Sequence, residues 1–135
     1  MYNAENSVPA HSLKFSRLPG LFAICQLPAG SDVPDWARQG RFFSVTRTED
    51  ELSVVCQAGQ VPAEVRHEGD WSCLKLEGPF PFSLTGVLAS FIKPLSEQAI
   101  SILALATYDT DYVLVKTSSL DRAIEILKRA GHTEI

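Results

Sequence analysis

The sequence predicts an α+β fold of the ferredoxin-like kind, in which the order strand, helix, strand, strand, helix, strand (βαββαβ) occurs in each of two halves. Short apolar runs bounded by glycine and proline indicate strands, and two segments of the second half carry apolar residues at helical spacing. Two hairpin sequences also resemble each other, because residues 51–55 (ELSVV) and 111–115 (DYVLV) each follow a turn that contains threonine. This order gives antiparallel sheets with helices packed on one face.

The first half is expected to form a unit over residues 12–66. An apolar run at 21–27 predicts its first strand, which ends at a Pro-Ala-Gly sequence. The Ser-Asp pair after it is suited to cap a short helix ending near Arg38. Alternating segments at 41–46 and 52–56, separated by a polar turn, predict a hairpin.

The second half, expected to form a unit over residues 71–135, carries stronger signals. Alternation at 71–76 predicts a strand, and the apolar run 100–106 predicts another, since it is too short for a buried helix. A tight turn leads into the return strand 112–116. An amphipathic helix then occupies 120–130 and ends at a glycine.

A further helix is expected between the first two of these strands. Ser83 is suited to be its N-cap, and Pro94 is expected to bend or subdivide it by removing the hydrogen bond to the Ser90 carbonyl. Its apolar residues at helical spacing are Leu84, Val87, Leu88, Phe91 and Leu95.

Composition excludes several classes of protein. A chain of 135 residues, 45% hydrophobic and 21% charged, is of ordinary single-domain size and should bury a core. Its net charge of −4 and the absence of a Lys/Arg cluster argue against nucleic acid as a partner. No apolar run approaches the roughly 18 residues that span a bilayer, so no membrane association is expected.

The chain is expected to be cytoplasmic. The apolar segment 18–29 is interrupted by proline and glycine and lies too far from the start for a signal peptide. The three cysteines, Cys25, Cys56 and Cys73, are odd in number, form no CxxC pair and lie in apolar segments, which is typical of buried reduced thiols.

Signatures of enzymes and metal sites are scarce. There is no GxGxxG, GxxxxGK[ST], GxSxG or HExxH motif. His11, His67 and His132 have no acidic or cysteine neighbours at ligand spacing and are expected at the surface. Asp109 and Asp111 resemble half of a calcium loop, but an apolar strand comes after them. We therefore expect neither a metal nor a cofactor.

Two features point instead to a small-molecule site. Gly86 stands in the predicted helix, where glycine is unfavourable, and residues 107–111 (TYDTD) end an apolar strand with an acidic turn. Backbone N–H groups at 85–87 suit the carboxylate of an amino acid, and the carboxylates of Asp109 or Asp111 suit a cationic group. Close helix packing at Gly86 and a solvated turn are the alternative explanations.

The stretches 71–78, 84–89 and 100–115 together resemble an ACT domain. More specifically, they resemble the paired-ACT proteins related to the regulatory part of aspartate kinase and to the animal cytosolic arginine sensors. The resemblance covers residues 71–131, whereas the first half matches in order and hairpin but lacks a counterpart of Leu84-Thr85-Gly86.

This resemblance implies a ligand-sensing module without catalysis of its own, with small ligands, usually amino acids, bound between ACT units. One ligand site per chain is implied, along with a regulated protein partner. A homodimer is expected on other grounds, because two units of about 60 residues are each of marginal size. The ligand-binding residues implied in this sequence are Ser83, Leu84, Thr85, Gly86, Val87, Thr107, Tyr108, Asp109 and Asp111.

Three hypotheses about function remain open on the sequence. The first is a regulatory protein with two ACT units that binds an amino acid; the acidic turn suits arginine, lysine, threonine and others alike. The second is a ligand-free module that dimerises through sheet edges and regulates a partner. The third is a small enzyme with Asp109 or Asp111 as general base, which no neighbouring nucleophile or metal cluster supports.

Overall fold

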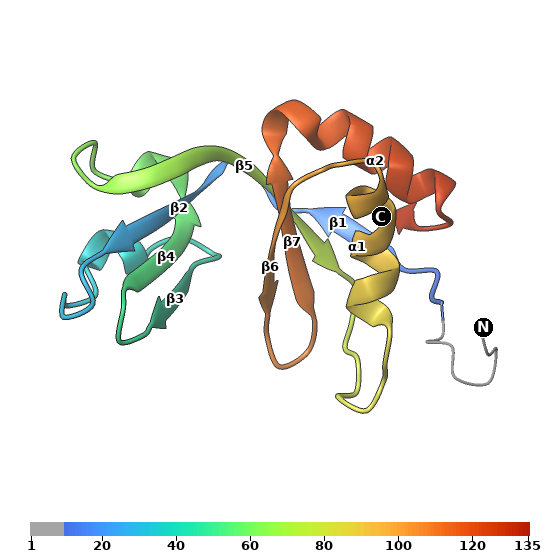
Figure 1. The fold of residues 1–135 in the computed structure, drawn as a ribbon, viewed down its shortest axis with the longest axis horizontal. Helices are drawn as coiled ribbons and strands as arrows, with labels where there is room; N and C mark the ends of the chain where they lie inside the picture. Colours follow the sequence, from blue (N-terminus) through green and yellow to red (C-terminus); the bar gives the residue numbers. More distant parts are fainter. Residues whose placement is uncertain (1–9) are drawn as a thin grey trace. The chain divides into compact units, whose positions relative to one another are not determined.

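The computed structural model describes residues 10–135, and the chain divides into two compact units. The inserted unit is Pro19–Ser72, and the split unit combines residues 10–18 with Cys73–Ile135. Figure 1 labels the elements of both units. No helix of the described residues is long and apolar enough to cross a membrane.

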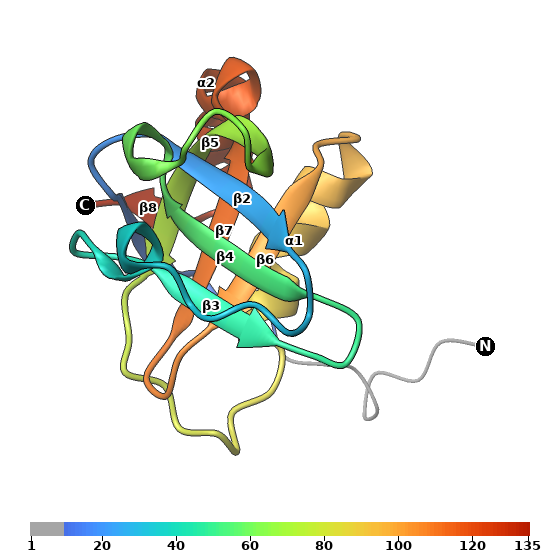
Figure 2. The same ribbon diagram turned by 90° about the vertical axis from the view of Figure 1, so that its left-hand side faces the viewer.

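The inserted unit has a four-stranded antiparallel sheet in the order β3-β4-β2-β5 (Figure 2). This is the order of a ferredoxin-like sheet, with β2 as the first strand and β5 as the last. The two α-helices of a ferredoxin-like fold are replaced in this unit by short 3-10 helices, one between β2 and β3 and one between β4 and β5. Its elements are β2 (Phe22–Leu27), η2 (Asp35–Arg38), β3 (Ser44–Arg47), β4 (Leu52–Gln57), η3 (Ala58–Gln60) and the first part of β5 (Arg66–Leu76).

One face of this sheet carries the core cluster of the inserted unit. The register places Ala23 opposite Cys56 and Cys25 opposite Val54, so these four side chains point to one face. Ala37 of η2 completes the buried cluster. The predicted short helix is therefore present as a single 3-10 turn, because Gln39 is extended and left-handed Gly40 (φ +87°) comes next.

The split unit has the strand order β8-β1-β5-β7-β6. Together with the second part of β5, its elements are β1 (Lys14–Arg17), α1 (Val87–Glu97), β6 (Ile102–Ala106), β7 (Asp111–Lys116), η4 (Thr117–Ser119), α2 (Leu120–Arg129) and β8 (Thr133–Glu134). This unit confirms the predicted α+β, ferredoxin-like class, and the strand order of the inserted unit agrees with it.

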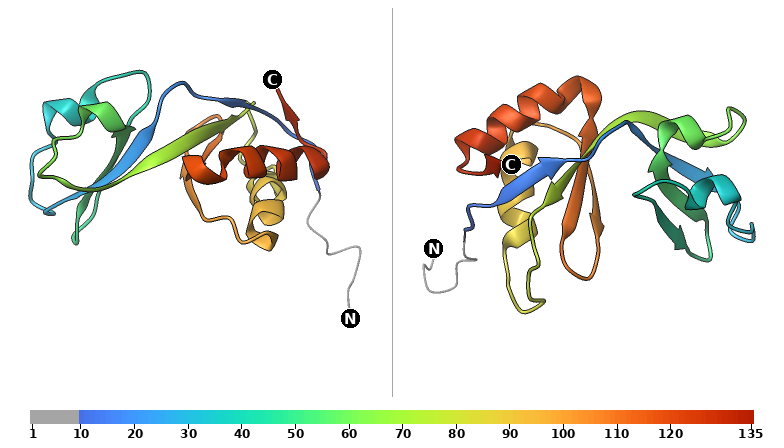
Figure 3. Two further views of the ribbon diagram at one scale, coloured as in Figure 1. Left: turned by 90° about the horizontal axis from the view of Figure 1, so that it is seen from above. Right: turned by 180° about the vertical axis from the view of Figure 1, so that it is seen from behind.

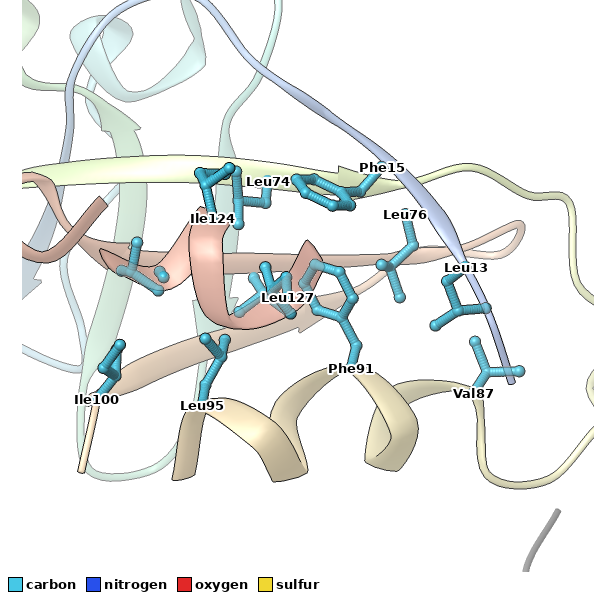
Figure 4. Close-up of a cluster of buried hydrophobic side chains, with 13 residues drawn as sticks. Leu13, Phe15, Leu74, Leu76, Val87, Phe91, Leu95, Ile100, Ile124 and Leu127 are labelled. Carbon is cyan, nitrogen blue, oxygen red and sulfur yellow. The ribbon is translucent and has the colours of Figure 1, made fainter. Parts of the chain in front are cut away.

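The core of the split unit lies between this sheet and its two α-helices. Figure 4 shows Val87, Phe91 and Leu95 pointing from α1 toward side chains of the strands and of α2. Phe15 and Phe91 meet edge to face with their ring centroids 5.4 Å apart. The buried members are Leu13, Phe15, Leu74, Leu76, Val87, Phe91, Leu95, Ile100, Val113, Val115, Ala123, Ile124 and Leu127.

The position of β1 corrects the expected division into residues 12–66 and 71–135. β1 pairs antiparallel with β5, where Phe15 lies opposite Leu76, and parallel with β8 (Figure 3). In a ferredoxin-like sheet the last strand lies beside the first strand. In the split unit the first strand is β5, and β1 lies beside it in place of the last strand, β8. Residues 12–18 consequently belong to the second unit, since Leu13 and Phe15 supply apolar side chains to its core.

The start of α1 differs from the prediction as well. The helix begins at Val87, and Gly86 occupies the N-cap position with φ +82°. Ser83 instead lies exposed in a turn that the Leu84 N–H closes by donating to the Pro81 carbonyl (3.0 Å). Only glycine adopts this left-handed conformation readily, so Gly86 marks the boundary between loop and helix rather than the helix interior.

Pro94 does not subdivide the helix, which runs unbroken from Val87 to Glu97. The Ser90 carbonyl that Pro94 leaves free accepts a hydrogen bond from His132 Nε2 at 2.9 Å. The freed acceptor is therefore satisfied inside the fold.

Candidate ligand-binding site

A hollow of about 180 Å³ separates the loop between β5 and α1 from the turn between β6 and β7. Six of the nine predicted site residues line it: Leu84, Val87, Thr107, Tyr108, Asp109 and Asp111. Sequence reasoning missed Phe80, Pro81, Phe82, Ala106 and Thr110, which line the same hollow. The two predicted segments are thus brought together by the fold.

The acidic turn is rigidly built. The Thr107 N–H donates to the Thr110 carbonyl (2.8 Å), and the Thr110 N–H donates to Thr107 Oγ1 (3.4 Å). The buried Thr110 hydroxyl donates to the Leu76 carbonyl of β5 at 2.8 Å. Thr110 therefore ties the turn to the strand from which the facing loop departs.

The facing loop is attached to the turn by its backbone. The Phe80 N–H donates to the Asp109 carbonyl at 2.8 Å. A Cβ atom at Gly78 would stand 2.8 Å from that same carbonyl oxygen, a distance that a side chain does not tolerate. Glycine at position 78 is thus required for this close approach, and Gly78-Pro79 is a cis peptide bond.

Two exposed aromatic rings stand at the rim of the hollow. Phe82 and Tyr108 are 75% and 80% exposed, and their rings meet edge to face with centroids 4.9 Å apart. The two rings together form an exposed apolar patch at the mouth of the hollow. Aromatic faces of this kind attract cations and planar groups.

The charged residues that line the hollow among the described residues are Asp109 and Asp111. Asp111 is half-buried, and this desolvation raises the pKa of its carboxyl group. A cation placed beside Asp111 would offset that unfavourable burial of charge. The hollow thus combines apolar walls with a negative end.

The remaining three predicted residues do not line this hollow. Ser83 and Thr85 are exposed, and the Thr85 carbonyl accepts a hydrogen bond from His11 Nε2 at 2.8 Å. Gly86 lines a second hollow of about 390 Å³ along α1, together with His11 and Ser90. At the start of α1, Val87 therefore lines the first hollow and Gly86 the second.

His132 is not at the surface, in contrast to the prediction, but 4% exposed. Its Nδ1 accepts a hydrogen bond from the Leu13 N–H (3.1 Å), while its Nε2 donates to the Ser90 carbonyl. This pattern places the proton of the bond to Ser90 on Nε2. His132 thus fastens the segment before β1 to α1.

Among the described residues, no group of three or more His, Cys, Asp and Glu side chains could hold a metal ion.

Both units of the chain match known protein families. Residues 66–129 match the family model of the ACT domain, and residues 20–64 match a second model, described as an N-terminal domain. The bovine (Bos taurus) cytosolic arginine sensor for mTORC1 subunit 1 is 34% identical over 100 residues, which are 66% of this chain and 30% of the sensor. The chain therefore spans about a third of the length of that relative.

Solved structures agree with the fold. A protein of Agrobacterium tumefaciens is 41% identical, with a TM-score of 0.89 over 93% of this chain and 94% of its own. The aspartate kinase of Clostridium acetobutylicum, 12% identical, has a TM-score of 0.64 over 96% of this chain and 37% of the kinase. The kinase likeness concerns the fold alone.

Proposed function

Since this chain is an ACT-domain protein, we propose that its split unit binds a small cationic molecule, in the first place an amino acid, in the 180 Å³ hollow. Binding then regulates a protein partner, and the chain has no catalysis of its own. The observation that carries this proposal is the pair Asp109 and Asp111 in a hollow whose other lining residues are uncharged.

The hollow also suits the remaining parts of an amino acid. Val87, the first residue of α1, lines it, and the first N–H groups of a helix favour a carboxylate. Phe82 and Tyr108 offer apolar surface and ring faces to a side chain or its cationic end. An α-carboxylate at the helix start and a cation at Asp111 would use both ends of the hollow.

The relatives support a regulatory role. One is named a cytosolic arginine sensor, and others of the same fold are aspartate kinases or their regulatory subunits. Because the chain spans less than a third of the bovine sensor, the partner and the cytoplasmic setting are carried over as part of the proposal.

Calorimetric titration with each of the twenty amino acids tests the proposal. We expect a cationic amino acid to bind, and we expect Asp111→Asn to weaken that binding by at least about tenfold, as loss of a charge-assisted contact does. Asp50→Asn, in the corresponding turn of the inserted unit, is the matched control and should bind normally. Equal affinity in the Asp111→Asn protein would reject this site.

The dependence of binding on pH is a second readout. The pKa of Asp111 is raised by burial, and a cation favours the ionised carboxylate. Binding should therefore strengthen as pH rises through this pKa, and the Asp111→Asn protein should lose that dependence. A dependence retained by the variant would assign the titration to another group.

A homodimer is the second candidate function, and strand β6 favours it. Within the described sheet β6 pairs only with β7, and its sequence, ILALA, carries no charge. Such an edge accepts another strand. Sedimentation velocity should detect a concentration-dependent dimer that Ala104→Lys disrupts, whereas Thr46→Lys on the edge strand β3 leaves it intact. A monomer at all concentrations would reject this candidate.

A further inference from the structure

The three residues that precede β1 form a strap (residues 11–13) against the start of α1. The His11 N–H donates to Ser90 Oγ at 3.0 Å. His11 Nε2 donates to the Thr85 carbonyl at 2.8 Å, and since a carbonyl oxygen only accepts, this nitrogen carries the proton of the bond. His11 therefore contacts both the loop just before α1 and the first turn of the helix.

The strap is fixed at its other end by Leu13. The Leu13 N–H donates to His132 Nδ1 at 3.1 Å, and the Leu13 carbonyl accepts the Thr133 N–H at 2.9 Å. The Leu13 side chain belongs to the same buried cluster as Val87, and Figure 4 shows these two side chains near each other. Leu13 thus anchors the strap, so that His11 reaches the loop from a fixed support.

The bond from His11 orients the peptide group that opens α1. Thr85 and Gly86 are joined by a trans peptide bond, in which the carbonyl and the N–H point in opposite directions. Holding the Thr85 carbonyl toward His11 therefore directs the Gly86 N–H to the opposite side. The Gly86 carbonyl is held in turn by the Ser90 N–H (2.9 Å) and the Ser90 hydroxyl (2.7 Å), which directs the Val87 N–H in the same way. The first N–H groups of a helix have no partner within it, and such groups bind anions.

The same bond holds one end of the loop that lines the ligand hollow. The other end is attached where the Phe80 N–H donates to the Asp109 carbonyl at 2.8 Å. Between these ends the Leu84 N–H closes a turn on the Pro81 carbonyl, and both residues line the hollow. Removing the His11 bond would therefore loosen the loop at the end that meets α1.

We propose that His11 is a positioning residue for the ligand hollow, and that it acts by orienting the first N–H groups of α1 without touching the ligand. This role rests on the proposed function, because it concerns how the same site receives the carboxylate of a cationic amino acid. His11 does not line that hollow but lies at the second one, with Gly86 and Ser90. The coupling is reciprocal: a carboxylate that favours the oriented helix start also favours the bond from His11 to Thr85.

Calorimetric titration of the whole protein with arginine, and separately with lysine, tests this role. His11→Ala should weaken binding about three- to tenfold, the range expected for the loss of one hydrogen bond to a carbonyl. His11→Gln should restore most of the affinity, because its amide nitrogen can take the place of Nε2 and also donates. His67→Ala is the matched control, since His67 is an exposed histidine of the inserted unit that bonds to the Val65 carbonyl, and this variant should bind as the wild type does.

Amide hydrogen exchange supplies a readout that a merely structural role would not move. Bound amino acid should slow exchange of the His11 amide in the wild-type protein, although His11 lies outside the ligand hollow. In ligand-free His11→Ala, exchange of the Ser90 amide should accelerate, because its acceptor, the Gly86 carbonyl, is less firmly held.

The possible results distinguish the role of His11 from the proposed function. Equal binding by wild type and His11→Ala, binding by His11→Gln as weak as that of His11→Ala, or a His11 amide that ignores bound ligand would each overturn the positioning role and leave the ligand site standing. If neither arginine nor lysine binds the wild-type protein, the proposed function is overturned, and the role of His11 with it.

Discussion

The two hairpin turns of this chain are built alike but are used differently. In each, a threonine N–H donates to the carbonyl three residues on: Thr48 to Glu51 at 2.9 Å, and Thr107 to Thr110 at 2.8 Å. The threonine hydroxyl oxygen in turn accepts the N–H of that later residue, at 3.2 Å and 3.4 Å. The two hairpins therefore share a backbone frame that aligns Thr48 with Thr107, one residue out of step with the alignment of 51–55 on 111–115 that the sequences suggest.

The two turns differ in burial and in their contacts with the rest of the unit. Thr110 is buried and bonds to β5, and the Asp109 carbonyl holds the loop before α1, whereas the turn around Thr48 is exposed. A turn becomes the wall of a hollow only where a second loop is held against it. The difference teaches that acidic turn residues alone do not form such a hollow: Gly78 leaves room for the close approach of the loop, and Thr110 bonds the turn to β5.

The hydrophobic cores of the two units also differ, and again the split unit has the more extensive contacts. The split unit buries phenylalanine and leucine side chains from two α-helices, while the cluster of the inserted unit is built largely from alanine and cysteine. We expect substitutions in the split unit to lower the free energy of unfolding more than substitutions in the inserted unit. Four pairs of substitutions, one from each unit, test this expectation from the largest effect to the smallest.

Phe91→Ala should lower the free energy of unfolding by about 3–5 kcal/mol, because it leaves a large cavity against Phe15. The partner substitution Val54→Ala, in the fully buried cluster of the inserted unit, should cost roughly 2 kcal/mol. Urea unfolding measures both. Equal losses would contradict the expected difference between the two cores.

His132→Ala should cost about 2–3 kcal/mol, since the Leu13 N–H and the Ser90 carbonyl lose their buried partner. His67, which is exposed and bonds to the nearby Val65 carbonyl, should tolerate alanine within about 0.5 kcal/mol. Hydrogen exchange of the Leu13 amide should accelerate in His132→Ala alone. An unchanged exchange rate would contradict the fastening role of His132.

Thr110→Val should cost about 1 kcal/mol, because it keeps the shape of the side chain but removes the buried hydrogen bond to the Leu76 carbonyl. Thr48→Val, at an exposed turn, should cost roughly half as much. Chemical denaturation compares them. If Thr48→Val proved the costlier change, the contrast between the turns would be wrong.

Glu134→Gln should cost at most about 1 kcal/mol at pH 7, as expected for an ion pair near the surface. The Arg17 hydrogen bond lowers the pKa of Glu134, so its stabilisation is present above the ordinary glutamate pKa of about 4.3 and is lost as pH falls through the lowered value. Stability curves of wild type and variant should therefore converge in acid. Asp35→Asn, in the exposed pair with Arg38, should have a smaller effect at pH 7.

Local patterns predicted the strands and the acidic turn well, because alternation and turn residues act over a few neighbours. They did not predict β1, whose four residues contain one buried side chain, Phe15, and whose partners are distant in sequence. The pattern identified Gly86 as unusual but not as a helix boundary. Phe80 and Phe82 escaped notice because nothing local shows that their loop bonds to Asp109. Long-range hydrogen bonds decide these features.

The pairing of β1 with β8 also fixes an order of events during synthesis. Lys14 lies opposite Thr133, which the ribosome adds 119 residues later. At 5–20 residues per second, this interval is about 6–24 s. The whole inserted unit, Pro19–Ser72, is made within it and has time to fold first. The first strand of residues 10–135 therefore waits longest for the partner that completes its sheet.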